Sequence, residues 1–405
     1  MRVELPRRRP PMATQDPRLP ALAARAALIE PFHVMELVKR ADDLKRAGRS
    51  IIHLSIGEPD FTAPPPVVRA LQDAAASGAT GYTSALVLHA LREAIAAYSG
   101  REFDTPIDAS RVLVTAGASG ALLLACAALV NPGDAVLLSD PGYPCNRHFV
   151  SALNGIARPV AVDPTTRYQL DAALVDAHWR GDVRGVLLAS PSNPTGTSIA
   201  FDELGRVIEV ARKRGGFAIV DEIYLGLSYA GRPRSALAHG DDVVSIGSFS
   251  KFFNMTGWRL GWLVLPPAWV PTFEKLAQNL YICASALAQR AALACFGDEA
   301  MTIYRQRREE FRARRDFIVP AVRELGFGVP VEPDGAFYVW LDCSAFTRDS
   351  DAFAIEMLEG TGVALVPGKD FGANQPERHL RLSYATSLAN LHEAVQRLRG
   401  WLPRR

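Results

Sequence analysis

Short apolar segments that alternate with helix-like segments constrain the fold of this chain more than any other feature of its sequence. They lie at residues 112–115, 135–138, 185–189, 217–220 and 243–246. Strands that are apolar on both faces and are separated by helices are typical of a parallel sheet buried between helices. The sequence therefore predicts an α/β fold whose large domain has a mostly parallel mixed sheet between helices.

The two ends of the chain show a different pattern, in which strands and helices no longer alternate. A helical pattern at 22–46 precedes a strand at 51–56, and a long charged helix past residue 280 precedes strands at 336–340 and 380–383. We therefore expect a smaller α+β domain that is built from both chain ends. The predicted parts are a disordered leader with the alternative start Met12 (1–20), small domain (21–62), large domain (63–295) and small domain again (296–405).

Composition excludes several other classes of protein. The net charge of +2 creates no global field that would attract nucleic acid or a membrane. The five cysteines form no CxxC pair, and the histidines have no metal-binding spacing, so we expect a reducing compartment and no metal. No apolar stretch is long enough to span a membrane. The composition is typical of a soluble globular enzyme and favours a reducing cytosol.

Candidate functional residues follow the apolar strands, where ligands bind in open α/β sheets. Ala118 and Ser119 lie in a turn of small residues before a helix, a place suited to an anion, although a plain tight turn is an equal alternative. Tyr143 lies between two prolines and has the geometry to stack on a planar cofactor or to pack under its loop. Asn193, also between prolines, offers an amide to a phenolate-like oxygen.

Charged residues at the later strands carry the stronger signal. Asp221 ends an apolar strand and needs a cationic partner or a role as a helix cap, and Tyr224 follows three residues later. Lys251 lies among aromatic and small residues, where an amine is suited to form a Schiff base. Arg259 and Ser248 offer phosphate-binding groups nearby. An arginine at position 381, inside an apolar strand, indicates either a structural ion pair or a carboxylate-binding fork.

Taken together, these segments resemble fold-type I pyridoxal-phosphate (PLP) aminotransferases of class I/II, in the branch of the bacterial aspartate aminotransferases. The resemblance covers about residues 28–398. Its motifs occur in order: SNPTG at 192–196, DEIY at 221–224, SxSK…MTGWRxG at 248–261 and RLSYA at 381–385.

The resemblance implies PLP as cofactor and a role for each candidate residue. Lys251 would hold the cofactor and move a proton, and Asp221 would keep the pyridine nitrogen protonated. Asn193 and Tyr224 would bind the phenolic oxygen of the ring, and Tyr143 would stack on the ring. The residues implied in phosphate binding are Ala118, Ser119, Ser248, Arg259 and, from a neighbouring subunit of a homodimer, Tyr82.

The resemblance also implies the reaction. Arg381 would bind the substrate carboxylate with help from Gly57 and Asn193, and amino groups would pass from an L-amino acid to a 2-oxo acid, with 2-oxoglutarate or pyruvate as acceptor, in ping-pong fashion. The nearest rival is a PLP-dependent C–S β-lyase. A transcription regulator is a more distant rival, because such regulators need a DNA-binding domain and only about twenty residues precede the first expected helix. A nucleotide-binding dehydrogenase is also more distant, because no GxGxxG follows the first strand.

The sequence departs from the family pattern in two places. Val87 stands where related sequences usually have glycine, so a positive φ there would strain a β-branched residue. The phosphate loop lacks the lysine of some dicarboxylate-specific relatives, which weakens a preference for aspartate. An apolar substrate pocket is expected from Leu28, Ile29 and Phe32.

Overall fold

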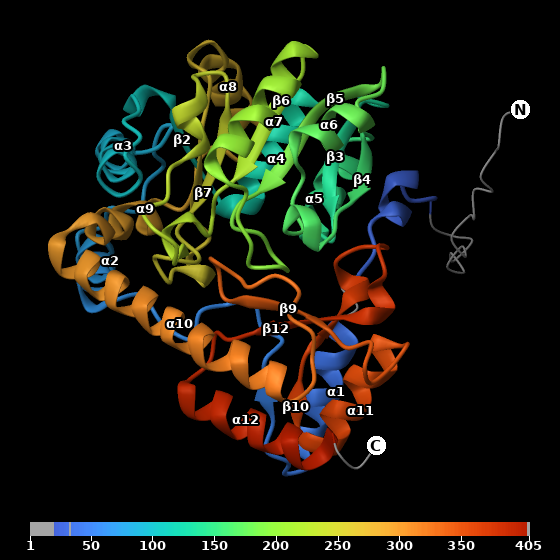
Figure 1. Cartoon of the computed structure of the whole chain (residues 1–405). Coiled ribbons are helices and arrows are strands. Elements are labelled where there is room, and N and C mark those ends of the chain that lie inside the picture. Colours follow the sequence, from blue (N-terminus) through green and yellow to red (C-terminus); the bar gives the residue numbers. More distant parts are fainter. Residues whose placement is uncertain (1–19, 32–33, 403–405) are drawn as a thin grey trace, which may run out of the picture.

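A computed structural model describes residues 20–31 and 34–402 of the chain. The predicted leader, apart from Pro20, lies outside the described residues, as do Met12 and Phe32. The side chain of Leu28 is likewise not described. Figure 1 shows two layers of structure, with the large sheet above and a smaller sheet with its helices below.

The large sheet has seven strands in the order β2-β8-β7-β6-β5-β3-β4. Strand β8 is antiparallel to both of its neighbours, and the other pairs are parallel, so the predicted mostly parallel mixed sheet is confirmed. The strands are β2 (Val112–Thr115), β3 (Ala135–Asp140), β4 (Ile156–Ala161), β5 (Val183–Ala189), β6 (Phe217–Asp221), β7 (Val244–Ser248) and β8 (Gly261–Val264).

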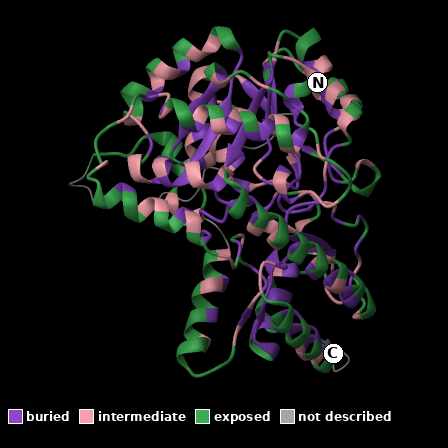
Figure 2. Ribbon diagram, turned by 90° about the vertical axis from the view of Figure 1, so that its left-hand side faces the viewer, coloured by how far each residue is buried: buried purple, intermediate pink, exposed green. Residues whose placement is uncertain are grey.

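Helices cover this sheet, and its strands other than the edge strand β4 are largely buried (Figure 2). Along β2, Val112 and Val114 belong to one apolar cluster while Leu113 belongs to the other. This alternation follows from the pleat, which sends successive side chains to opposite faces. The helices of this part are α2 (Pro65–Ala76), α3 (His89–Phe103), α4 (Gly117–Leu129), α5 (Pro144–Ala152), α6 (Ala172–His178), α7 (Phe201–Lys213), α8 (Val270–Tyr281) and α9 (Ala286–Leu293).

The smaller layer joins the two ends of the chain. Strand β1 (Ile52–His53) pairs in parallel with β10 (Val363–Ala364), more than three hundred residues later. Strands β11 (Val366–Pro367), β12 (His379–Ser383) and β9 (Tyr338–Asp342) form an antiparallel sheet. The helices are α1 (Val34–Arg46), α10 (Asp298–Glu324), α11 (Ser350–Thr361) and α12 (Leu388–Trp401). The domain boundaries given above stay a prediction.

Three local differences from the sequence-based prediction have physical causes. The helix expected at 22–46 is interrupted: a 3-10 helix (Ala24–Leu28) precedes α1, and Pro31 lies between them, where proline disfavours a continuous helix. Strand β4 was not predicted because most of its residues are partly or fully exposed. Strand β8 was not predicted because it begins at Gly261, the last residue of the SxSK…MTGWRxG motif, so no turn separates the strand from the motif. Among the described residues, no helix is long and apolar enough to cross a membrane.

Candidate active site

A cavity of about 460 Å³ is lined by residues at or just past the carboxyl ends of β5, β6 and β7 and by residues of the smaller layer. Every predicted site residue except Tyr82 lines this cavity: Gly57, Ala118, Ser119, Tyr143, Asn193, Asp221, Tyr224, Ser248, Lys251, Arg259 and Arg381. Strand ends and loops that are far apart in the sequence therefore meet at one place, as the open α/β architecture predicts.

Lys251 lies three residues past the end of β7 and is half-buried. Its Nζ donates a hydrogen bond to the Gly57 carbonyl oxygen at 2.7 Å. Burial, together with the positive charges of Arg381 and Arg259, lowers the pKa of Lys251 to about 8. An amine with this pKa is partly neutral near physiological pH, which is the form that attacks a carbonyl carbon.

Asp221 is the last residue of β6 and is 3% exposed. Its Oδ1 accepts a hydrogen bond from the Ile223 backbone N–H at 3.2 Å, and no described basic side chain forms an ion pair with it. Burial raises the pKa of Asp221 to about 7. A buried carboxylate without a cation is costly, so this position suits a ligand that brings a protonated nitrogen.

A cradle suited to an anion lies at the first turn of α4. Arg259 has a left-handed backbone, with φ of 54°, and donates from Nη1 to the Thr256 carbonyl oxygen at 2.9 Å. A Cβ atom on Gly117, whose φ is +78°, would lie 2.4 Å from Arg259 Nη2. Only glycine therefore lets the guanidinium lie against the helix N-terminus. Ala118 and Ser119 follow in the same turn, where backbone N–H groups and the helix dipole favour a phosphate.

Arg381, in β12, is 7% exposed and has no acidic partner among the described residues. Its Nη1 donates to Asn193 Oδ1 at 2.9 Å and its Nη2 to the Ser55 carbonyl oxygen at 2.7 Å. Its guanidinium carbon lies 4.6 Å from the ring centre of Tyr338 and 4.8 Å from that of Phe371. The structural ion pair that the sequence left open is absent from the described residues, and the buried charge suits a carboxylate ligand.

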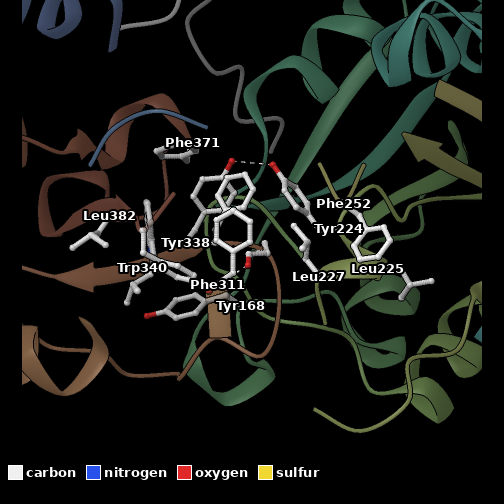
Figure 3. Packing of buried hydrophobic residues seen from close by; sticks show 14 of the residues in the cluster. Tyr168, Tyr224, Leu225, Leu227, Phe252, Phe311, Tyr338, Trp340, Phe371 and Leu382 are labelled. Carbon is white, nitrogen blue, oxygen red and sulfur yellow. Dashed lines mark hydrogen bonds between the residues drawn. The ribbon is translucent and has the colours of Figure 1, made fainter. Parts of the chain in front are cut away.

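Tyr224 and Tyr338 both line the cavity and are in contact with each other. Their hydroxyl oxygens are 2.9 Å apart, as the dashed line in Figure 3 marks. Burial raises the pKa of both hydroxyl groups, so both stay protonated hydrogen-bond donors. The position of Tyr338 against Gly57, where a Cβ would lie 2.8 Å from its hydroxyl oxygen, was not predicted. The sequence signal was the GAFY segment at 335–338, which the family resemblance implies on the small-domain side of the cleft, and Tyr338 does line the cavity.

Two residues named in the sequence analysis do not line the cavity, and a third lies in a strained backbone conformation. Tyr82 is 82% exposed and does not line it. Ile29 is 41% exposed and does not line it either, so the apolar wall predicted there is not formed by this residue. Val87, however, does have the positive φ that the sequence comparison raised as a source of strain: its φ is 86°, and its side chain is buried.

Comparisons with known proteins agree with this geometry. The family described as aminotransferase class I and II matches residues 49–398. The chain is 37% identical over 377 residues to a valine–pyruvate aminotransferase of Mycobacterium tuberculosis, covering 93% of this chain and 97% of that protein. It is 33% identical to an aspartate aminotransferase of Thermotoga maritima, covering 91% and 96%.

Solved structures lead to the same family. The crystal structure of an aminotransferase from Mycobacterium tuberculosis has a TM-score of 0.91 and 36% identity, with 96% of this chain and 100% of that chain covered. Aspartate aminotransferase from Thermus thermophilus with maleate has a TM-score of 0.88 and 30% identity, with 94% and 100% covered. This chain is a member of the class I and II aminotransferase family, a fold-type I enzyme that transfers an amino group between an amino acid and a 2-oxo acid.

Proposed function

We propose that this aminotransferase uses PLP, that Lys251 binds its carbonyl carbon and that Asp221 binds its pyridine nitrogen. The observation that carries the proposal is the pairing, in one cavity, of an amine whose pKa is lowered to about 8 with a buried carboxylate that forms no ion pair within the described part of the chain. When bound, PLP acts as an electron sink for a carbanion at the substrate Cα. Asp221 would hold a proton on the pyridine nitrogen, and Lys251 would accept and return the Cα proton.

The remaining cavity residues would orient the cofactor. Tyr143, at the start of α5, would stack on the ring, while the Tyr224 hydroxyl and the Asn193 amide would bind the phenolic oxygen. The Asn193 oxygen already accepts from Arg381, so its NH₂ group is the part left for this contact. The phosphate would lie in the cradle formed by Ala118, Ser119, Ser248 and Arg259.

The substrate would lie between Arg381 and Lys251. Arg381 would bind the α-carboxylate, with Asn193 and the Gly57 backbone at its side, and Lys251 would act at Cα. One amino acid leaves as a 2-oxo acid before a second 2-oxo acid binds, which gives ping-pong kinetics. Pyruvate or 2-oxoglutarate is the proposed acceptor, and the name of the mycobacterial valine–pyruvate aminotransferase supports the former.

The active unit that we propose is a cytoplasmic homodimer. Tyr82 is 82% exposed and lies outside its own cavity, which supports a role for its hydroxyl at the phosphate site of a second copy. Leu280 and Ile282 are also exposed, at 60% and 48%, and would be buried by such an interface.

The test is a visible spectrum of the purified protein supplied with PLP, recorded before and after a panel of amino acids is added. We expect a band from the lysine-linked cofactor that changes when an amino donor reacts, and no such band in Lys251→Ala. Lys213→Ala, which removes a lysine with a 74% exposed side chain, is the matched control and should behave like the wild type. A protein that forms the band but reacts with no amino acid would contradict the proposal.

A further inference from the structure

We infer that the amino donor of this enzyme carries an uncharged aliphatic side chain and that Ile56 is the residue that selects it. The inference rests on the proposed function, because it assumes that Arg381 and Lys251 mark the two ends of the bound amino acid. It concerns the part of the cavity to which no role has been assigned so far: Val34, Met35, Val38, Ile56 and Leu122.

Ile56 occupies the point from which a substrate side chain would leave. The carbonyl oxygen of its preceding neighbour Ser55 accepts a hydrogen bond from Arg381 at 2.7 Å, and that of its following neighbour Gly57 accepts one from Lys251 at 2.7 Å. The Cα of an amino acid whose carboxylate is at Arg381 and whose nitrogen is at Lys251 must lie between these contacts. Ile56 lines the cavity and is 44% exposed, so its apolar surface is uncovered until a ligand covers it.

The first turn of α1 extends the same apolar wall. The backbone N–H of Val34 donates to Asp370 Oδ2 at 2.9 Å, and the next residue, Phe371, has its ring 4.8 Å from the guanidinium of Arg381. The start of α1 is thus held beside the carboxylate-binding arginine. Met35, which lines the cavity from this turn, is 57% exposed. Flexible thioether side chains of this kind adapt to aliphatic ligands of different shape.

The charges around the cavity disfavour a second carboxylate on the substrate. Three described lining residues are basic, Lys251, Arg259 and Arg381, and the cofactor and the substrate's α-carboxylate would engage all of them. The other charged lining residues are the acids Glu58, Asp221 and Asp370. A side-chain carboxylate would therefore lose water without gaining a cation from the described residues of this chain, whereas an aliphatic group would cover Ile56 and Met35.

Leucine and aspartate make the sharpest comparison, because their side chains have nearly the same branched shape and differ in charge. The PLP-loaded enzyme is mixed with each amino acid, and the rate of change of its cofactor band is followed as the concentration rises. We expect the apparent second-order rate constant for leucine to exceed that for aspartate by about 10-fold or more. Equal rates, or a faster reaction with aspartate, would overturn the inference while leaving the proposed function intact. Failure with every amino acid would instead contradict the proposed function.

A second experiment places the selectivity at Ile56. Ile56→Ala should lower the rate constant for leucine about 10-fold and leave the slow reaction with aspartate unchanged. Ile156→Ala is the matched control, because Ile156 is also 44% exposed but lies in β4 away from the cavity, and this variant should keep the wild-type preference.

A binding measurement on the same proteins does not depend on turnover. Calorimetry with 4-methylpentanoate and succinate, the deaminated counterparts of leucine and aspartate, should show tighter binding of the former and loss of that difference in Ile56→Ala. Tighter binding of succinate by the wild type would overturn the inference.

Discussion

Asp221 and Lys251 both depart from their ordinary pKa because burial disfavours the charged form of each. For Asp221 the folded pKa is raised from an unfolded value near 4, so the folded protein binds a proton that the unfolded chain has released. Its contribution to stability is therefore present at low pH and is lost as the pH rises through about 7. The ionised carboxylate, which is the form that the enzyme would use, therefore lowers the stability of the cofactor-free protein. A cationic ring nitrogen would offset this cost, and for that reason it fits beside Asp221.

This argument predicts a pH effect on the cofactor-free protein. Between about pH 5 and about pH 7, the free energy of unfolding of the wild type should fall relative to that of Asp221→Asn by about 1.4 kcal/mol per pH unit. Urea unfolding of both proteins at each pH measures this difference, and the subtraction cancels all other titrating groups. A difference that does not change with pH would show that Asp221 is not buried as a lone acid.

A second prediction at the residue scale separates affinity from stability at Gly117. Gly117→Ala should raise the dissociation constant for PLP about 10-fold or more, since its Cβ would lie 2.4 Å from Arg259 Nη2 and displace the guanidinium from the cradle. Gly133→Ala is the control, because Gly133 has a φ of +89° with no atom within 4 Å of the added Cβ. Both variants should lose about 1–2 kcal/mol of stability from the left-handed backbone. Equal PLP affinities in the two variants would contradict the cradle.

At the scale of elements, the loop after Tyr82 stores strain at Val87. An L-residue at a φ of 86° is strained by its Cβ, and the buried valine side chain offsets part of that cost by its packing. We predict that Val87→Gly is more stable than Val87→Ala by about 1 kcal/mol, because only glycine removes the strained Cβ. At Val114, in the buried strand β2, alanine should be the more stable replacement. Chemical unfolding of the four variants measures both differences in stability. If Val87→Ala were more stable than Val87→Gly, strain at position 87 would be ruled out.

The elements also show what the sequence can predict. Central strands such as β5 and β6 were predicted because burial on both faces forces an unbroken apolar run. The edge strand β4 has no such requirement, and its largely exposed residues carry no strand signal. The partners of Tyr338 within the cavity were not predicted, for another reason. Its contact with Tyr224 joins two elements more than one hundred residues apart, and only the packing of β9 under the large sheet creates it.

At the scale of the whole molecule, the cavity needs both ends of the chain. The pairing of β1 with β10 brings Ser55, Ile56 and Gly57 under the strand ends that carry Lys251. That the residues proposed to bind the cofactor line one cavity could be predicted because short motifs carry them, and each motif follows its own strand. The substrate wall could not, because Ile56 and Met35 become its surface only through contacts between segments that the sequence does not mark.

We propose that Tyr82 extends this dependence to a second copy of the chain, and subunit mixing tests the proposal. Tyr82→Ala dimers should bind PLP weakly, and Lys251→Ala dimers should be inactive. If each site combines Tyr82 from one copy with Lys251 from the other, a mixed dimer of the two variants contains one fully native site. Equal mixing should then restore about a quarter of the wild-type activity at limiting PLP, since about half of the dimers are mixed and each has one intact site. The reference for this activity is a mixture of Lys251→Ala and wild-type chains that contains the same total amount of native Lys251. Activity no higher than that of the unmixed Tyr82→Ala protein would place Tyr82 outside the neighbouring site, and its 82% exposure would then need another partner.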